Sequence, residues 1–216
     1  MPWLEGFFPR KSNQSPPDFP HKLKGVEDDL WKEEWSRGVY GFPIPVSDHF
    51  LSEGRALAGQ HPPERFIHQL GPFIISRSPE SHTKAFMQAL DFLVPDGTPV
   101  VATADGNIVE VVISNTEWGP GPDFSQFMNY ITVAHQDGEF SQYCHLAVNS
   151  APLGLTVGSE VKKGMQIAIT GKTGWTDRDH LHFMVFRSEK EQRIESATIK
   201  NPYGFKSLKP KFEGEK

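Results

Sequence analysis

The sequence predicts a mostly β protein: an antiparallel β-sheet sandwich or barrel-like domain that follows an irregular N-terminal extension with a short helix. From about Gly71 onward, short β-branched and apolar segments are separated by Gly, Pro, Asn and Asp, which is the pattern of an antiparallel sheet. Before that point prolines are frequent, and Pro16, Pro17 and Pro20 prevent any long regular element. These two observations divide the chain near residue 70.

The composition limits the kinds of site the chain can carry. Its 216 residues suffice for one domain with an appended segment. The 22 basic and 27 acidic residues give a net charge of −5, which argues against a nucleic-acid partner because such binders carry a basic surface. A single cysteine excludes an internal disulfide and any multi-cysteine zinc site. A metal would therefore be held by His, Asp or Glu, and the nine histidines are a sufficient pool.

Three segments are expected along the chain: an extension at 1–70, a β domain at 71–190 and a C-terminal tail at 191–216. The first residues show no basic stretch followed by the apolar core of a secretory signal. No run reaches the roughly 18–20 apolar residues that span a bilayer. As written, the chain is expected to be a cytoplasmic monomer without a membrane span or visible export route, although a leader removed beforehand would leave the same sequence.

The extension is predicted to contain one short helix. Val26, Leu30 and Trp35 lie near one face of an amphipathic helix between about residues 25 and 37, with acidic residues early in it. Residues 38–70 contain several prolines and are expected to be irregular. The three histidines of this stretch lack a partner pattern and are interpreted as exposed or structural: His49, His61 and His68.

Eight short segments of the β domain are candidate strands because turn residues bound each of them. The segment from Asn115 to Asn129 has too much Gly and Pro for a central strand, so it is predicted to be a long loop of the kind that often lines a site. The candidate strands are Phe73–Ser76, Ala89–Val94, Pro99–Ala102, Gly106–Ser114, Tyr130–His135, Glu139–Leu146, Gln166–Thr170 and His182–Arg187.

Two histidines stand one residue apart at the start of the last of these strands, in the sequence DHLHFMVF. Strand side chains alternate between faces, so His180 and His182 should share one face while Leu181, Phe183 and Val185 point into a core. Neutral imidazole is the commonest metal ligand in proteins. The pair therefore suggests one ligand and one neighbour that acts on what the metal binds, although paired histidines also occur as structural residues.

Asp91 is a carboxylate inside an otherwise apolar strand, in the sequence ALDFLVPDG. Burying an ionised carboxylate there is costly unless a cation or metal compensates its charge. Asp91 is therefore a candidate metal ligand. The alternative is that it faces solvent or accepts hydrogen bonds from backbone N–H groups.

The segment Tyr143-Cys144-His145-Leu146 returns from a hairpin turn at Asp137-Gly138. By alternation Tyr143 and His145 should share one face, while Cys144 and Leu146 take the buried one. A histidine and a phenol on one face supply a proton acceptor and a hydrogen-bond donor. Cys144 has no neighbour in sequence that lowers its pKa, so it is interpreted as a small buried hydrophobe.

These motifs together resemble the lysostaphin-type (LytM-like) zinc endopeptidases, metallopeptidases that cut peptidoglycan in the bacterial cell wall. The resemblance covers about Phe73 to Arg187 and rests on four blocks in order: ALDFLVPDGTPVVATADGNIVEV, ITVAHQDGEFSQYCHL, VGSEVKKGMQIAITGKTG and DHLHFMVF. It implies a mostly antiparallel peptidase domain of the duplicated hybrid motif type with a narrow groove. A phosphocarrier or lipoyl-like domain shares the hairpin around VGSEVKKG but explains neither Asp91 nor the histidine pair.

The resemblance implies that Asp91 and His182 bind one zinc ion and that His145 and His180 flank it as general base and transition-state stabiliser. In the commonest form of the family a histidine stands four residues before the aspartate, and here that residue is Met87. We assign the third ligand to His82, nine residues upstream of the aspartate, because two protein ligands are too few for a catalytic zinc site. The more distant alternative, which lacks a supporting motif, is His68.

The expected chemistry is zinc-dependent hydrolysis of peptide bonds in peptidoglycan cross-bridges or stem peptides, with a glycine-rich or D-amino-acid-containing peptide as partner. Tyr143 is a weaker candidate, as a substrate-binding residue that polarises the carbonyl. The alternative is a non-catalytic LytM-like domain that binds peptidoglycan or regulates a partner hydrolase. The family substrate implies an extracytoplasmic location, in the periplasm or secreted, which conflicts with the absence of a visible signal.

Overall fold

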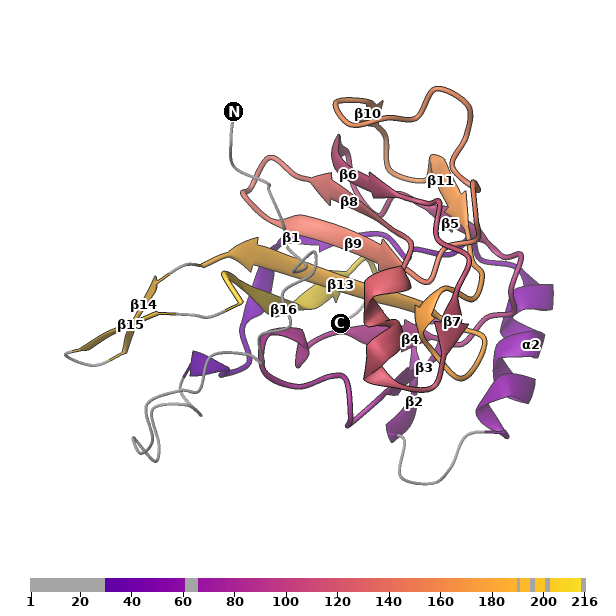
Figure 1. Ribbon diagram of the computed structural model, residues 1–216, viewed down its shortest axis with the longest axis horizontal. Helices are drawn as coiled ribbons and strands as arrows, with labels where there is room; N and C mark the ends of the chain where they lie inside the picture. The colour runs from indigo at the N-terminus through magenta and orange to yellow at the C-terminus, as the bar shows by residue number, and fades with distance from the viewer. Residues whose placement is uncertain (1–29, 61–65, 190, 195–196, 201–202, 215–216) are drawn as a thin grey trace.

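The structure is a computed structural model that describes residues 30–60, 66–189, 191–194, 197–200 and 203–214. Within these residues, ten strands form one large sheet (Figure 1). Along its main path the strands are β10 (Glu160–Val161), β6 (Gly106–Val112), β8 (Tyr130–Ala134), β9 (Phe140–Cys144), β13 (Leu181–Ser188), β4 (Leu90–Phe92), β3 (Phe73–Arg77) and β2 (Phe66–Leu70).

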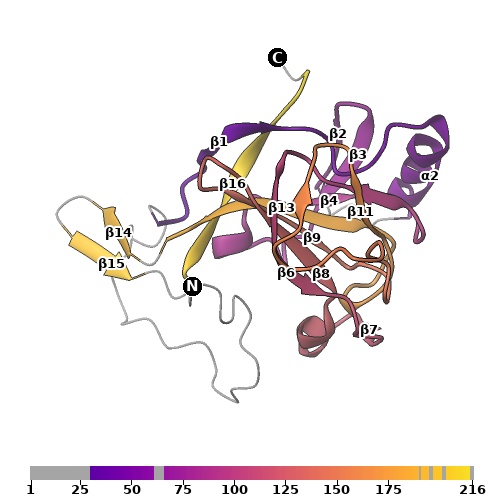
Figure 2. The same ribbon diagram turned by 90° about the horizontal axis from the view of Figure 1, so that it is seen from above.

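Strand β13 is the centre of this sheet. It pairs antiparallel with β9 along one edge, while β4 and then β16 (Phe205–Phe212) pair with the other edge. Strand β16 also pairs in parallel with β1 (Trp35–Tyr40), and the two lie side by side in Figures 1 and 2. The sheet therefore includes strands from both ends of the described chain.

Three two-stranded sheets, one α-helix and two 3₁₀ helices complete the described structure. The hairpin of β14 and β15 projects away from the large sheet on the side opposite α2 in both views (Figures 1 and 2). The paired strands are β5 (Pro99–Val101) with β11 (Gln166–Ile169), β7 (Trp118–Gly119) with β12 (Gly174–Trp175), and β14 (Glu191–Ile194) with β15 (Ala197–Lys200). The helices are α2 (Asp48–Ala58), η1 (Lys84–Phe86) and η2 (Pro122–Phe127).

The side chains of β13 fill two separate cores because they alternate across the sheet. Leu181, Phe183 and Val185 belong to the main core, together with β-strand residues from both halves of the sheet. Met184 and Phe186 point to the other face and pack in a second cluster. That cluster also contains Leu30, Trp31, Ala85, Ala89 and Phe205.

The predicted fold class is confirmed, and each of the eight candidate strands corresponds to an observed strand with ends shifted by at most a few residues. The predicted loop from Asn115 to Asn129 contains the short strand β7 and the helix η2. No helix in the described part of the chain is long and apolar enough to cross a membrane.

The extension differs from expectation in two places. Of the helix predicted at about 25–37, residues up to 29 lie outside the described residues, and Trp35 to Arg37 belong to strand β1. The stretch 38–70, expected to be irregular, contains α2 and β2. Helix α2 begins after Ser47, whose hydroxyl accepts the N–H of Phe50 as an N-cap. The prolines of this stretch flank the helix instead of interrupting it, so their number does not prevent regular structure.

The expected boundaries near residues 70 and 190 are not boundaries of the sheet. Strands β1 and β2 come from the extension, and β16 comes from the segment expected to be a tail. Tyr40 of β1 and Leu208 and Phe212 of β16 belong to the main core, and Leu70 of β2 packs against it.

Candidate metal centre

Three side chains that are far apart in sequence meet at the end of the strand pair β4–β13. His82 Nε2 lies 3.1 Å from Asp91 Oδ1, His182 Nδ1 lies 3.0 Å from the same oxygen, and the two histidine nitrogens are 3.3 Å apart. His82 and Asp91 are buried, and His182 is nearly so. These are the three ligands predicted for the metal, and the structure brings them together.

The sheet register explains why Asp91 and His182 meet. They lie directly opposite each other on the antiparallel strands β4 and β13. Directly opposite residues on one face have Cβ atoms about 4.5–5.5 Å apart, which is close enough for both side chains to contact one ion. The register therefore positions two of the three groups without help from any loop.

His82 reaches the cluster from a turn that follows β3. The N–H of His82 donates to the carbonyl of Ser78 at 2.7 Å, and the chain then passes through η1 to β4. Met87, which stands where the commonest family pattern has its histidine, is 39% exposed. The turn therefore supplies the imidazole from nine residues upstream of Asp91, and the position four residues upstream faces solvent.

The protonation states suit metal binding. Burial would raise the pKa of Asp91, but His82, His180 and the hydrogen bonds from His182 and His82 hold that pKa well below its usual range. Burial lowers the pKa of His182 even though the neighbouring carboxylate acts in the opposite direction. An ionised carboxylate beside a neutral imidazole is the form in which both groups bind a metal.

The donor atoms also fit the geometry of zinc. In a tetrahedral site with Zn–N distances of about 2.0–2.1 Å, neighbouring donor atoms are about 3.3–3.4 Å apart. The three separations in the cluster are 3.0, 3.1 and 3.3 Å. Two imidazoles and one carboxylate match the three protein ligands of a catalytic zinc site, which keeps a fourth position open.

His145 and His180 stand beside the cluster, as predicted from the resemblance. Their ring centroids are 4.8 Å apart, and His180 Nε2 lies 3.6 Å from Asp91 Oδ1. His145 Nδ1 donates to the carbonyl of Thr173 at 2.7 Å, and His180 Nδ1 donates to the carbonyl of Arg178 at 3.0 Å. Each bond fixes a tautomer whose Nε2 carries the free lone pair.

His145 is kept neutral by its surroundings. Burial, followed by the neighbouring His180 and His182, lowers the pKa of His145 to about 3. Its backbone adopts φ 61°, in the left-handed region that residues other than glycine rarely adopt. Such strained residues cluster at functional sites, because the surrounding structure has to hold them in place.

Tyr143 does not share the face of His145, so its predicted substrate-binding position is wrong. It is fully buried in the main core, where its hydroxyl bonds to the Thr103 N–H at 2.9 Å and to Ser141 Oγ at 3.0 Å. The alternation fails because β9 ends at Cys144 and His145 leaves the extended conformation. Cys144 instead lies directly opposite His182, and burial raises the pKa of its thiol well above the usual value.

Two loops are bonded to each other, and one of them contains Thr173, which orients His145. Strand β7, within the long loop, pairs in parallel with β12, and Trp175 Nε1 donates to the carbonyl of Pro120 at 2.9 Å. The N–H of Asn129 donates to Thr173 Oγ1 at 3.1 Å, which joins the end of the long loop to the residue that orients His145. Sequence reasoning did not single out Thr173 or Ser78 as parts of the site. Thr173 acts through its backbone carbonyl, and Ser78 acts through its carbonyl and through its hydroxyl, which donates to Asp91 Oδ2. Neither residue belongs to a spacing pattern that could have indicated these contacts.

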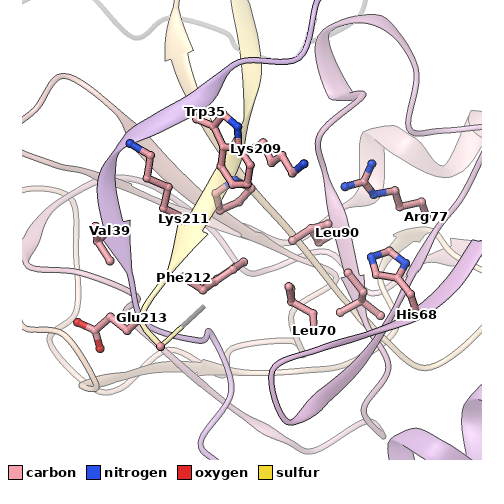
Figure 3. Close-up of a pocket in the computed structure, with 13 residues that line it drawn as sticks. Trp35, Val39, His68, Leu70, Arg77, Leu90, Lys209, Lys211, Phe212 and Glu213 are labelled. Carbon is pink, nitrogen blue, oxygen red and sulfur yellow. The ribbon is translucent and has the colours of Figure 1, made fainter. Parts of the chain in front are cut away.

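The other histidines among the described residues lie away from the cluster, and His61 lies outside those residues. His135 bonds to the carbonyl of Asp105 and to Ser141 Oγ, and His49 is exposed on α2. His68, the alternative third ligand, lines a different pocket of about 610 Å³ (Figure 3). That pocket lies between β1 and β16 on one side and β2 and β3 on the other, and no residue of the metal cluster lines it.

A β-sheet protein with a His/Asp/His cluster and two oriented histidines beside it has the features of a metallopeptidase. The chain belongs to peptidase family M23, whose sequence model matches residues 85–195. The match includes Asp91, His145, His180 and His182 but begins after His82. The assignment of His82 as a ligand therefore depends on the geometry of this chain.

Individual relatives are similar to parts of the chain. It is 27% identical over 176 residues to an uncharacterized metalloprotease of Buchnera aphidicola subsp. Baizongia pistaciae (strain Bp), covering 80% of this chain and 40% of the relative. It is 38% identical over 95 residues to the glycyl-glycine endopeptidase ALE-1 of Staphylococcus capitis, covering 44% of this chain and 23% of the relative. The chain thus spans less than half of the length of these curated relatives.

Among solved structures, the catalytic domain of lysostaphin from Staphylococcus simulans matches with 34% sequence identity and a TM-score of 0.35. The match covers 45% of this chain and 65% of that domain.

Proposed function

We propose that this chain is a zinc-dependent endopeptidase that hydrolyses peptide bonds in the cross-bridges or stem peptides of peptidoglycan. The observation that carries the proposal is the convergence of His82 Nε2, Asp91 Oδ1 and His182 Nδ1 within 3.3 Å of one another. The relative named as a glycyl-glycine endopeptidase supports a glycine-rich cross-bridge as the substrate. A stem peptide with D-amino acids is the other candidate.

In this proposal, three side chains hold the metal and two others move protons. His82, Asp91 and His182 are the ligands, and they leave a fourth position open for the substrate or water. Bound zinc supplies a Lewis acid that polarises the scissile carbonyl and lowers the pKa of water to about 7.

His145 acts as the general base. Because its Nδ1 donates to the Thr173 carbonyl, its Nε2 is free to accept a proton from the attacking water. Burial disfavours the charged form of His145, which keeps the imidazole neutral before the reaction.

His180 is the proposed transition-state stabiliser, because it lies beside both His145 and Asp91. Its Nδ1 donates to the Arg178 carbonyl, so protonation at Nε2 turns that nitrogen into a donor that faces the cluster. In that form His180 stabilises the developing oxyanion and delivers a proton to the leaving amine.

Metal analysis tests the zinc site. The full chain, purified without chelator, is expected to hold about one zinc ion by mass spectrometry of the metal, because three ligands suffice for a catalytic site. His82→Ala is expected to lose the metal. His49→Ala is the matched control, since His49 is exposed and lies away from the cluster, and it should keep the metal. A wild-type chain free of zinc would contradict the proposal and favour the non-catalytic alternative.

A digestion experiment identifies the bond. Isolated peptidoglycan with glycine cross-bridges and peptidoglycan with direct cross-links are each incubated with the chain, and mass spectrometry of the released peptides identifies the cleaved bond. New amino termini at glycine indicate cross-bridge cleavage, and new termini within D-amino-acid-containing peptides indicate stem-peptide cleavage. Absence of both with a zinc-loaded chain would overturn the assigned substrate while leaving the metal site intact.

A further inference from the structure

Ser78 touches two of the three residues that converge in the metal cluster. It lies just beyond β3, and only 7% of its surface is exposed. Its hydroxyl donates to Asp91 Oδ2 at 2.9 Å, whereas Oδ1 of the same carboxylate faces His82 and His182. The two oxygens of Asp91 therefore have separate partners, and only one of them faces the metal-binding position.

The backbone of Ser78 holds the third member of the cluster. Its carbonyl accepts the N–H of His82 at 2.7 Å and the N–H of Ser81 at 3.2 Å. Pro79 and Glu80 lie at the exposed outside of this turn, while His82 returns to a buried position. One residue thus orients Asp91 through its hydroxyl and His82 through its carbonyl.

This arrangement accounts for the nine residues that separate His82 from Asp91. A longer connection leaves an imidazole free to move unless both ends of the connection are held. The far end is held by Ala85 and Ala89, which are completely buried in the second cluster, and by the Gln88 N–H, which donates to Ser207 Oγ at 2.9 Å. Ser78 holds the near end.

Groups that orient metal ligands contribute strongly to metal affinity. Replacing such a partner typically costs about 10–100-fold in affinity, because the ligand then loses its orientation before the metal binds. A carboxylate with one oxygen held by a hydroxyl also presents the other oxygen as a single ligand atom, which suits a four-coordinate zinc site.

We infer that Ser78 is the positioning residue of the metal centre, which fixes Asp91 and His82 together and so makes the long spacing between them compatible with zinc binding. The inference rests on the proposed zinc site. It concerns binding of the metal, and its test does not depend on turnover.

Zinc affinity, measured for the full chain by competition with a chromogenic chelator, tests the role of the hydroxyl. Ser78→Ala is expected to weaken zinc binding about 10–100-fold. Ser76→Ala is the matched control. Ser76 is a buried serine on β3, two residues before Ser78, and it lies opposite Asp91 in the sheet. Its Oγ has no hydrogen-bond partner among the described residues. It is expected to bind zinc as the wild type does.

A second pair of variants separates the hydroxyl from the shape of the side chain. Ser78→Thr keeps a hydroxyl, and Ser78→Val introduces a side chain of nearly the same shape as threonine that lacks the hydroxyl. The threonine variant is therefore expected to bind zinc more tightly than the valine variant. This comparison also serves if Ser78→Ala fails to fold, which thermal unfolding in excess chelator detects. Equal affinity of the threonine and valine variants, or of Ser78→Ala and the wild type, overturns the inference. A wild type that binds no zinc instead overturns the proposed function.

Discussion

At the scale of single residues, His145 is oriented by two constraints that act on different parts of it. Its ring is held by the Thr173 carbonyl, and its backbone is held at φ 61°. Thr173 is in turn fixed through its hydroxyl, which accepts from the N–H of Asn129 and donates to the carbonyl of Leu146, each at 3.1 Å. The proposed base therefore has little freedom to turn its Nε2 away from the cluster.

Replacing His145 should separate catalysis from metal binding. His145→Ala is expected to lower the rate of peptide hydrolysis by about 10²–10⁴-fold, the usual contribution of a positioned general base. Zinc content should stay near the wild-type value, because His145 contributes no atom to the three-donor cluster. Rate measurements on a defined peptide, with His49→Ala as control, check this. Loss of zinc together with activity would mean that His145 is a ligand.

The parts of the site that sequence reasoning found are those governed by regular strands. Asp91 and His182 could be predicted because β4 and β13 keep their alternation up to the point where these residues pair. Tyr143 was misplaced because the positive φ of His145 ends that alternation. His82 required the resemblance as well, since the turn at Ser78 that brings it to Asp91 leaves no periodic pattern.

At the scale of elements, helix α2 packs closely on the strands that carry the cluster. Gly54 is its only buried residue, and a Cβ added there would lie 2.5 Å from the carbonyl oxygen of Leu93, just after β4. The absence of a side chain at Gly54 thus allows the helix backbone to approach the sheet.

Gly54→Ala should therefore destabilise the protein, although alanine is the better helix former. The gain in helix propensity is about 1 kcal/mol, while overpacking typically costs about 1–3 kcal/mol, so a net loss is expected. Denaturant unfolding of the zinc-free chain measures it. Glu53→Ala, at an exposed position on the same helix, should leave stability unchanged or slightly raised. A more stable Gly54→Ala variant would show that the helix can move away from Leu93.

Strands were easier to predict than the extension for a physical reason. In the β domain each strand is bounded by turn residues and contributes apolar side chains at a spacing of two. Helix α2 buries only Gly54 fully, and only Phe50 and Leu51 of its larger apolar side chains pack against the core, so the apolar stripe by which a helix is recognised is short. Its N-cap at Ser47 was the signal that could have located it.

At the scale of the whole molecule, the sheet joins segments from both ends of the described chain. Strand β1 pairs with β16, which fills the edge of β13 that β4 leaves free. Glu34 and Arg187 add an ion pair between the residues before β1 and strand β13, with Oε2 and Nη2 2.6 Å apart.

A fragment limited to residues 71–190 should therefore fail to fold cooperatively. It would lack β1, β2 and β16, and it would remove buried core residues such as Tyr40, Leu208 and Phe212. Each large buried side chain contributes on the order of 2–5 kcal/mol, and a whole domain is typically stable by only about 5–15 kcal/mol. Circular dichroism during heating checks this against the full chain. A sharp transition with wild-type zinc content in the fragment would show that the added strands are dispensable.

The parallel pairing of β1 and β16 also determines how the molecule resists tension. Because the two strands run in the same direction, a pull on the chain before Trp35 and after Phe212 draws them in opposite directions along their length. The hydrogen bonds between the two strands are then loaded in shear and bear the force together. They include the bond from the Lys209 N–H to the Glu34 carbonyl and the bond from the Glu213 N–H to the Tyr40 carbonyl. The first and last strands of the described chain thus resist mechanical unfolding of the sheet that carries the metal cluster.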